Sequence, residues 1–155
     1  MTDISKPTTV GKLGTAETPR GGRQWLPAIA RVLMGLMFFV FGLNGFLNFI
    51  PVPKTIPEDV VNVTGALMKA GYMTVVSGAE VLAAVMLLTN RFVPLALALL
   101  APIIVGILTF HVAMARETIG PGLIVLAIEL YLAWAYRDAF QPMLAFKTSP
   151  GSNRA

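Results

Sequence analysis

Three ionisable side chains lie inside long apolar stretches of this sequence, and they are Arg31, Glu80 and Glu129. Charged groups within a membrane-sized apolar segment are costly, and those that occur there often serve a function. At a helical rise of about 1.5 Å per residue, both glutamates fall near the middle of their stretches, and Arg31 falls about 9 Å to one side of its own. We expect the three to converge in a polar pocket, with Ser77 on the same helix face as Glu80.

Two carboxylates at close range in a low dielectric cannot both ionise cheaply, so one would hold or share a proton unless Arg31 neutralises it. Such a cluster could bind a ligand, a cation or the carbonyl of a quinone-like headgroup, or it could relay protons. The alternative is structural, because the same groups could form a buried ion pair or hydrogen-bond clamp that fixes the register of the helices. The residues leave both interpretations open.

A second polar group lies towards the ends of two apolar stretches, where Asn44 and Asn48 end the first and His111 ends the third. These residues could form an outer polar site. They could equally act locally, with the asparagines capping a helix or binding the loop and the histidine turned to headgroups. The chain has no cysteine and a single histidine, so it offers no nucleophile and base pair. We therefore predict no metal site and no enzyme that acts alone.

Positioning these side chains requires helices in a membrane. Hydrophobic residues make up 55% of the 155 residues and charged residues 13%, about half the share of a soluble domain. The net charge is +4, but the lysines and arginines form no basic stripe, so nucleic-acid binding is not expected. We predict an all-α membrane bundle of four helices, with a short amphipathic helix after Pro57, between the first two. The four apolar ranges are Trp25–Phe49, Tyr72–Leu88, Phe92–Ala113 and Gly120–Arg137.

The glycines of the first range point to close packing. Arg31, Gly35, Phe38, Gly42 and Gly45 fall on one helix face, which favours close approach of another helix there. We expect one membrane domain over 25–146 between disordered tails at 1–24 and 147–155. Most lysines and arginines lie on the side that holds both termini, which predicts that both termini are cytoplasmic.

Three stretches together resemble the DoxX family of small bacterial membrane proteins. They are ARVLMGLMFFVFGLNGFLNFIPVP (Ala30–Pro53), GAEVLAAVMLLTNRFVPLALALLAPIIVGILTFH (Gly78–His111) and LAIELYLAWAYRDAFQPML (Leu126–Leu144). The resemblance implies a four-helix bundle in the bacterial cytoplasmic membrane. Its recurrent positions match Arg31, Gly35, Gly42, Glu80, Asn90, Arg91, His111 and Glu129. Asn48 and Gly106 depart from the pattern, which argues against a paired histidine site for metal or haem.

The resemblance extends to a subunit of a thiosulfate:quinone oxidoreductase and to proteins linked to redox or oxidative-stress partners. It implies a membrane-embedded accessory subunit of a quinone-linked system, with a quinone as the possible cofactor and a membrane or soluble redox protein as partner. Two alternatives remain: a transporter of a small solute or proton, and a non-enzymatic scaffold or assembly factor. The sequence also leaves open whether copies of the chain assemble into a homo-oligomer.

Overall fold

The computed structural model describes residues 25–51 and 56–141, and every regular element in these ranges is helical. The all-α prediction is thereby confirmed for this part of the chain. The tails predicted at 1–24 and 147–155 lie outside the described residues. In chain order the elements are α1 (Trp25–Leu47), α2 (Glu58–Lys69), α3 (Tyr72–Leu88), α4 (Val93–Met114), the short 3-10 helix η2 (Arg116–Thr118), α5 (Gly120–Ala135) and α6 (Arg137–Phe140).

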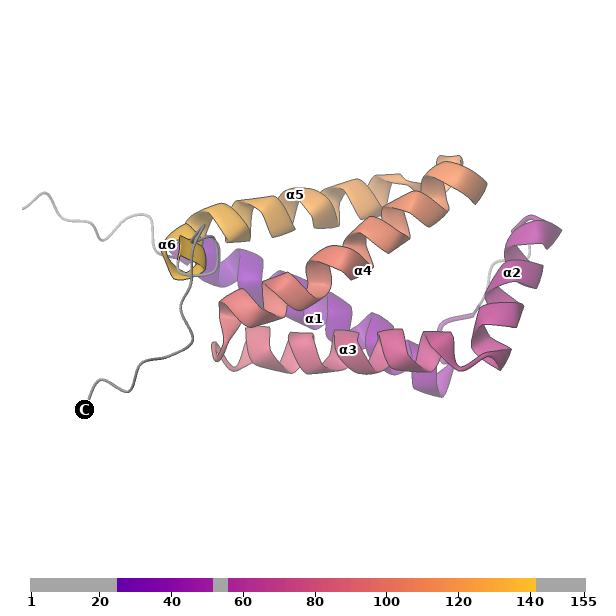
Figure 1. Ribbon diagram of the computed structural model, residues 1–155, viewed down its shortest axis with the longest axis horizontal. Helices are drawn as coiled ribbons and strands as arrows, with labels where there is room; N and C mark the ends of the chain where they lie inside the picture. The colour runs from indigo at the N-terminus through magenta and orange to yellow at the C-terminus, as the bar shows by residue number, and fades with distance from the viewer. Residues whose placement is uncertain (1–24, 52–55, 142–155) are drawn as a thin grey trace, which may run out of the picture.

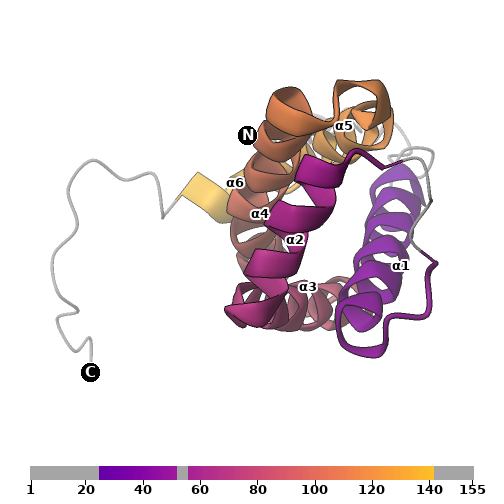
Figure 2. The same ribbon diagram turned by 90° about the vertical axis from the view of Figure 1, so that its right-hand side faces the viewer.

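The helices α1, α3, α4 and α5 run along the long axis of the molecule, each antiparallel to the one before it (Figure 1). Both α1 and α4 contact α3 and α5, so the four form a closed ring with α3 and α5 on opposite sides (Figure 2). The most extensive contact joins α1 and α3. Below, the "Trp25 end" is the end with Trp25 and the α3–α4 turn, and the "Leu47 end" is the opposite one.

An apolar core fills the ring. Each of the four helices contributes a buried stripe whose members recur at helical spacing, as expected for helices that bury one face. The fully buried large side chains of this core are Met34, Leu87, Leu97, Leu100, Ile104 and Leu132. Many large apolar side chains also lie exposed on the outer surface of the ring, the arrangement of helices whose outer faces contact hydrocarbon.

Within the described ranges, two helices, α1 and α4, are long and apolar enough to cross a membrane. The number rises to three if α2 and α3, which meet at a bend of 80°, are counted as one broken span. The helix α5 is also apolar, but its 16 residues are too few for it to count as a membrane-spanning helix by itself. The helices α1 and α4 therefore support the prediction of a membrane protein, and the prediction of four crossings stays a proposal.

The predicted helix bounds agree with the structure to within about two residues. The first helix ends at Leu47 rather than Phe49, because Asn48 adopts a left-handed backbone (φ 49°) that stops helical hydrogen bonding. The fourth ends at Ala135, after which α6 begins at Arg137. The amphipathic helix is present as α2, and its bend into α3 uses the positive φ of Gly71, 76°.

Candidate functional site

The glycine face of α1 packs against α3, as the sequence predicts. A Cβ added to Gly45 would lie 1.9 Å from Ser77 Oγ, and one added to Gly42 would lie 3.1 Å from Glu80 Cβ. Such spacing tolerates no side chain at either position without a shift of the helices. The glycines therefore fix where Ser77 and Glu80 stand relative to α1.

Glu80 lies buried in the middle of α3, with 8% of its surface exposed. Ser77 and Ala84, which share its predicted face, are buried with it, and Met73 is half-buried. Among the residues that the structure describes, neither Glu80 nor Ser77 has a side-chain hydrogen bond or an ion pair. The α1–α3 contact thus holds a carboxyl group inside the ring without supplying it with a donor.

Glu129 occupies the corresponding position on α5 and is 6% exposed. Its helix packs on α4 through Gly122, where an added Cβ would lie 3.1 Å from Leu108. The Oε2 atom of Glu129 is buried and has no hydrogen-bond partner in the described ranges. Burial of an acceptor without a donor costs free energy, about 1–3 kcal/mol in a neutral group and more in a charged one.

The two carboxyl groups lie at the same depth on opposite sides of the ring. Glu80 stands about two helical turns from the α3–α4 turn, and Glu129 about two turns from the contact of Gly122 with Leu108. Counted along α4, which contacts both helices, each position is level with about Leu100, a fully buried core residue. No hydrogen bond or ion pair joins the two glutamates within the described part.

Arg31 is buried but does not reach either carboxylate, so the expected convergence of all three groups is wrong for the arginine. Its Nη1 donates to the carbonyl oxygen of Leu87, at the carboxyl end of α3. That carbonyl lies about 10 Å along α3 from Glu80. The sequence places Arg31 on the correct face of its helix, but the face does not determine which acceptor a long side chain reaches.

The polar residues near the Leu47 end have partners on their own segments. Asn44 Oδ1 accepts from the Ile50 N–H at 2.7 Å, and Asn48 donates its N–H to Asn44 O at 2.8 Å. His111 Nδ1 lies 2.7 Å from Ile107 O, and the ring nitrogen is the donor because a carbonyl only accepts. No hydrogen bond joins His111 to either asparagine in the ranges described. The hydrogen bonds of the asparagines fit the interpretation as local helix-end contacts, and the shared outer site of the three residues stays a prediction.

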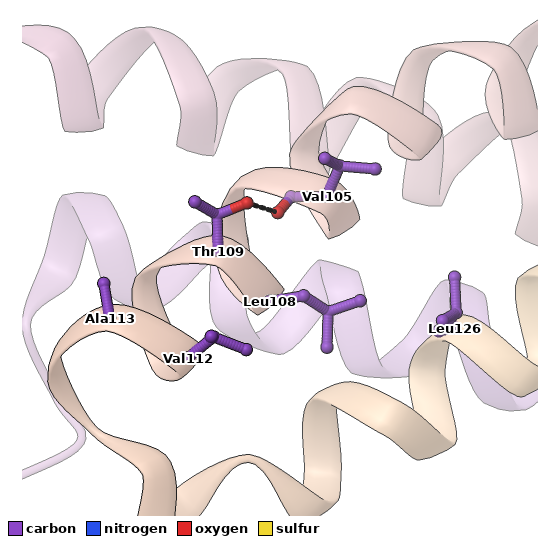
Figure 3. Close-up of a pocket in the computed structure, with 6 residues that line it drawn as sticks. All are labelled: Val105, Leu108, Thr109, Val112, Ala113 and Leu126. Atoms are coloured by element: carbon purple, nitrogen blue, oxygen red, sulfur yellow. Dashed lines mark hydrogen bonds between the residues drawn. The ribbon is translucent and has the colours of Figure 1, made fainter.

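An apolar groove of about 440 Å³ lies between α4 and α5 and was missed by the sequence reasoning (Figure 3). The hydroxyl of Thr109, its most polar lining group, is bonded to Val105 O at 2.8 Å. The groove thus presents mainly hydrocarbon. Its residues follow the same pattern as any lipid-facing stripe, so no signal in the sequence distinguishes them. The lining comprises Val105, Leu108, Thr109, Val112, Ala113 and Leu126.

The arrangement places two buried carboxyl groups on opposite sides of an apolar core. In the described residues there is no cluster of three or more histidine, cysteine or acidic side chains that could hold a metal ion. Comparison of the chain with protein-family models, curated proteins and solved structures finds no match in any of the three. The resemblance to the DoxX family therefore stays a prediction from the quoted stretches.

Proposed function

We propose that this protein is a DoxX-like, four-span protein of the bacterial cytoplasmic membrane with both termini in the cytoplasm. In this proposal α3 and α5 cross together with α1 and α4. Their contacts in the closed ring support it, and so do the exposed apolar side chains Val75 on α3 and Ile124 on α5, each more than 60% exposed. Helices of this length can cross when their ends recruit flanking residues or the bilayer thins locally.

The site proposed for a ligand comprises the buried carboxyl groups of Glu80 and Glu129, on opposite sides of the apolar core. The observation that carries it is that both carboxyl groups are buried at one depth and have no partner among the described residues. Buried polar groups are as a rule hydrogen-bonded, and each exception calls for an explanation such as a catalytic role or an unseen ligand. A small amphipathic molecule with carbonyl or hydroxyl oxygens, such as a quinone, supplies complementary hydrogen bonds.

The role follows from the chemistry of such a ligand. Reduction of a quinone to the quinol adds electrons and a proton at each oxygen, and a carboxyl group in contact with that oxygen can deliver the proton. The electrons come from a partner redox protein, since this chain has no cysteine to ligate a cluster. We therefore propose a membrane-embedded accessory subunit of a quinone-linked redox system, in which Glu80 and Glu129 bind the headgroup and relay protons.

The test is the quinone content of the purified protein. The wild-type chain, purified in mild detergent from quinone-containing membranes, should retain quinone, and Glu80→Gln and Glu129→Gln should each lower retention about tenfold, equivalent to about 1.4 kcal/mol. Glu117→Gln is the matched control, because this residue lies exposed on η2. Absence of quinone from the wild type, or equal retention by all three variants, would overturn the proposal.

A further inference from the structure

Arg31 carries a buried charge for which the described residues provide no counter-ion. It is 9% exposed, Nη1 donates to Leu87 O, and Nε is buried without a partner in the described ranges. No acidic side chain of those ranges lies within ion-pair distance. Buried charges in proteins are normally paired, because the desolvation cost of a lone ion is large.

The end of α3 offsets only part of this cost. Leu87 O also accepts the Asn90 N–H at 3.2 Å, and Met86 O accepts the Arg91 N–H at 3.0 Å, so the helix ends in a closed turn. Its partial negative charge favours a nearby cation, by about 0.3–2 kcal/mol. That is less than the cost of burying a guanidinium. The same turn also carries Arg91, which is exposed and has no ion pair in the described part.

The acidic side chains of the described ranges either contact another cation or lie far from Arg31 along the helices. Asp138 lies towards the same Trp25 end on α6, where Arg137 Nε stands 3.9 Å from its carboxylate (Figure 1). Glu80 is about 10 Å further along α3. The remaining acids of the described ranges are Glu58 and Asp59 on α2, Glu117 on η2 and Glu129 in the middle of α5. Among the residues that the structure describes, Arg31 and Arg91 therefore approach or occupy the α3–α4 turn without an acidic partner.

We propose that Arg31 and Arg91 bind the phosphate group of an anionic lipid headgroup at the Trp25 end. Arg31 stands about 9 Å along α1 from Trp25, an exposed aromatic of the type that marks the membrane interface. A guanidinium extending from this depth to the α3–α4 turn lies within reach of lipid phosphates. Its planar donors match phosphate oxygens, and a negatively charged cytoplasmic leaflet would supply them. The proposal requires a bilayer around the ring but not the ligand proposed for the two glutamates.

The experiment measures thermal unfolding of the full chain in nanodiscs, followed by the fluorescence of its tryptophans. Replacing part of a neutral phosphatidylcholine bilayer with phosphatidylglycerol should raise the unfolding midpoint of the wild type by about 3 °C or more. Arg91→Gln should reduce this rise by about half, and Arg31→Lys, which keeps the charge but loses the planar fork, should also reduce it. Native mass spectrometry of the wild type should show retained phosphatidylglycerol.

Arg137→Gln is the matched control, because Arg137 is exposed at the same end and its guanidinium stacks 5.1 Å from the Trp134 ring. This variant should keep the full rise. Millimolar inorganic phosphate in phosphatidylcholine nanodiscs, matched in ionic strength with chloride, separates the two sources of phosphate. If free phosphate raises the unfolding midpoint as much as phosphatidylglycerol does, the proposal that a lipid supplies the phosphate is wrong. No rise in either arm, or an equal rise in Arg31→Lys, Arg91→Gln and Arg137→Gln, overturns the site.

Discussion

The polar side chains near the Leu47 end and the ionisable side chains inside the ring satisfy their hydrogen bonds in opposite ways. Asn44, Thr109 and His111 each bond to a backbone group within six positions on their own segment. Arg31 has one partner and an orphaned Nε, while Glu80 and Glu129 have none in the described residues. The first group needs nothing from outside the chain. The second group leaves unmet hydrogen bonds that a ligand or a lipid can complete.

The difference separates two kinds of polar residue that look alike in an apolar sequence. A residue that bonds to its own segment lowers the cost of lying in hydrocarbon and serves the local fold. A buried group that lacks a partner raises the free energy of the folded chain, and it persists only where something compensates. We therefore expect substitutions near the Leu47 end to change stability alone, and substitutions inside the ring to change binding.

The largest effect is expected at the α1–α3 contact, where the glycines of α1 fix the position of Glu80. Gly45→Leu places a side chain where even a Cβ would lie 1.9 Å from Ser77 Oγ, so α1 and α3 must separate. We expect a loss of about 3 kcal/mol in the free energy of unfolding, measured by denaturant titration in mixed micelles. Gly106→Leu is the control, because an added Cβ there meets nothing within 4 Å. An equal loss of unfolding free energy in both variants would show that the close packing at Gly45 does not account for the effect.

The second effect tests whether the glutamates are functional or structural. Glu80→Gln and Glu129→Gln replace a carboxyl group that lacks a donor with a neutral amide of the same shape. Because the wild-type groups make no bond to be lost among the described residues, we expect the free energy of unfolding to stay within about 1 kcal/mol or to increase. The same micelle titration, on protein stripped of lipid-soluble ligands, measures it. A loss of about 3 kcal/mol or more would assign both residues to a structural clamp.

Much of the local fold could be predicted, because periodicity and depth follow from the sequence. The buried face of α1 contains Gly35, Phe38 and Gly42 together with Arg31, and that of α3 contains Ser77 together with Glu80, as helical spacing predicts. The bounds of α3, Tyr72–Leu88, agree with the predicted range. Each of these features depends on a few neighbouring residues and on helix geometry alone.

The arrangement around the site could not be predicted in the same way. The wheel places Arg31 on the packed face, but only the register of α1 on α3 brings its guanidinium to Leu87 O instead of Glu80. Similarly, α3 and α5 lie on opposite sides of the ring, so Glu80 and Glu129 face one interior without touching. Which helices become neighbours depends on packing between distant segments. A single sequence carries that information only weakly.

The smallest effect belongs to the Leu47 end. Asn44→Ala removes the oxygen that accepts the Ile50 N–H, so we expect a loss of about 1 kcal/mol in unfolding free energy and no change in quinone retention. Asn62→Ala on α2 is the control, because this exposed amide has no hydrogen bond within the described ranges. If Asn44→Ala left stability unchanged but lowered quinone retention, the bond to Ile50 would be incidental. The residues near the Leu47 end would then belong with the ligand site, and local hydrogen bonding would no longer distinguish the two groups.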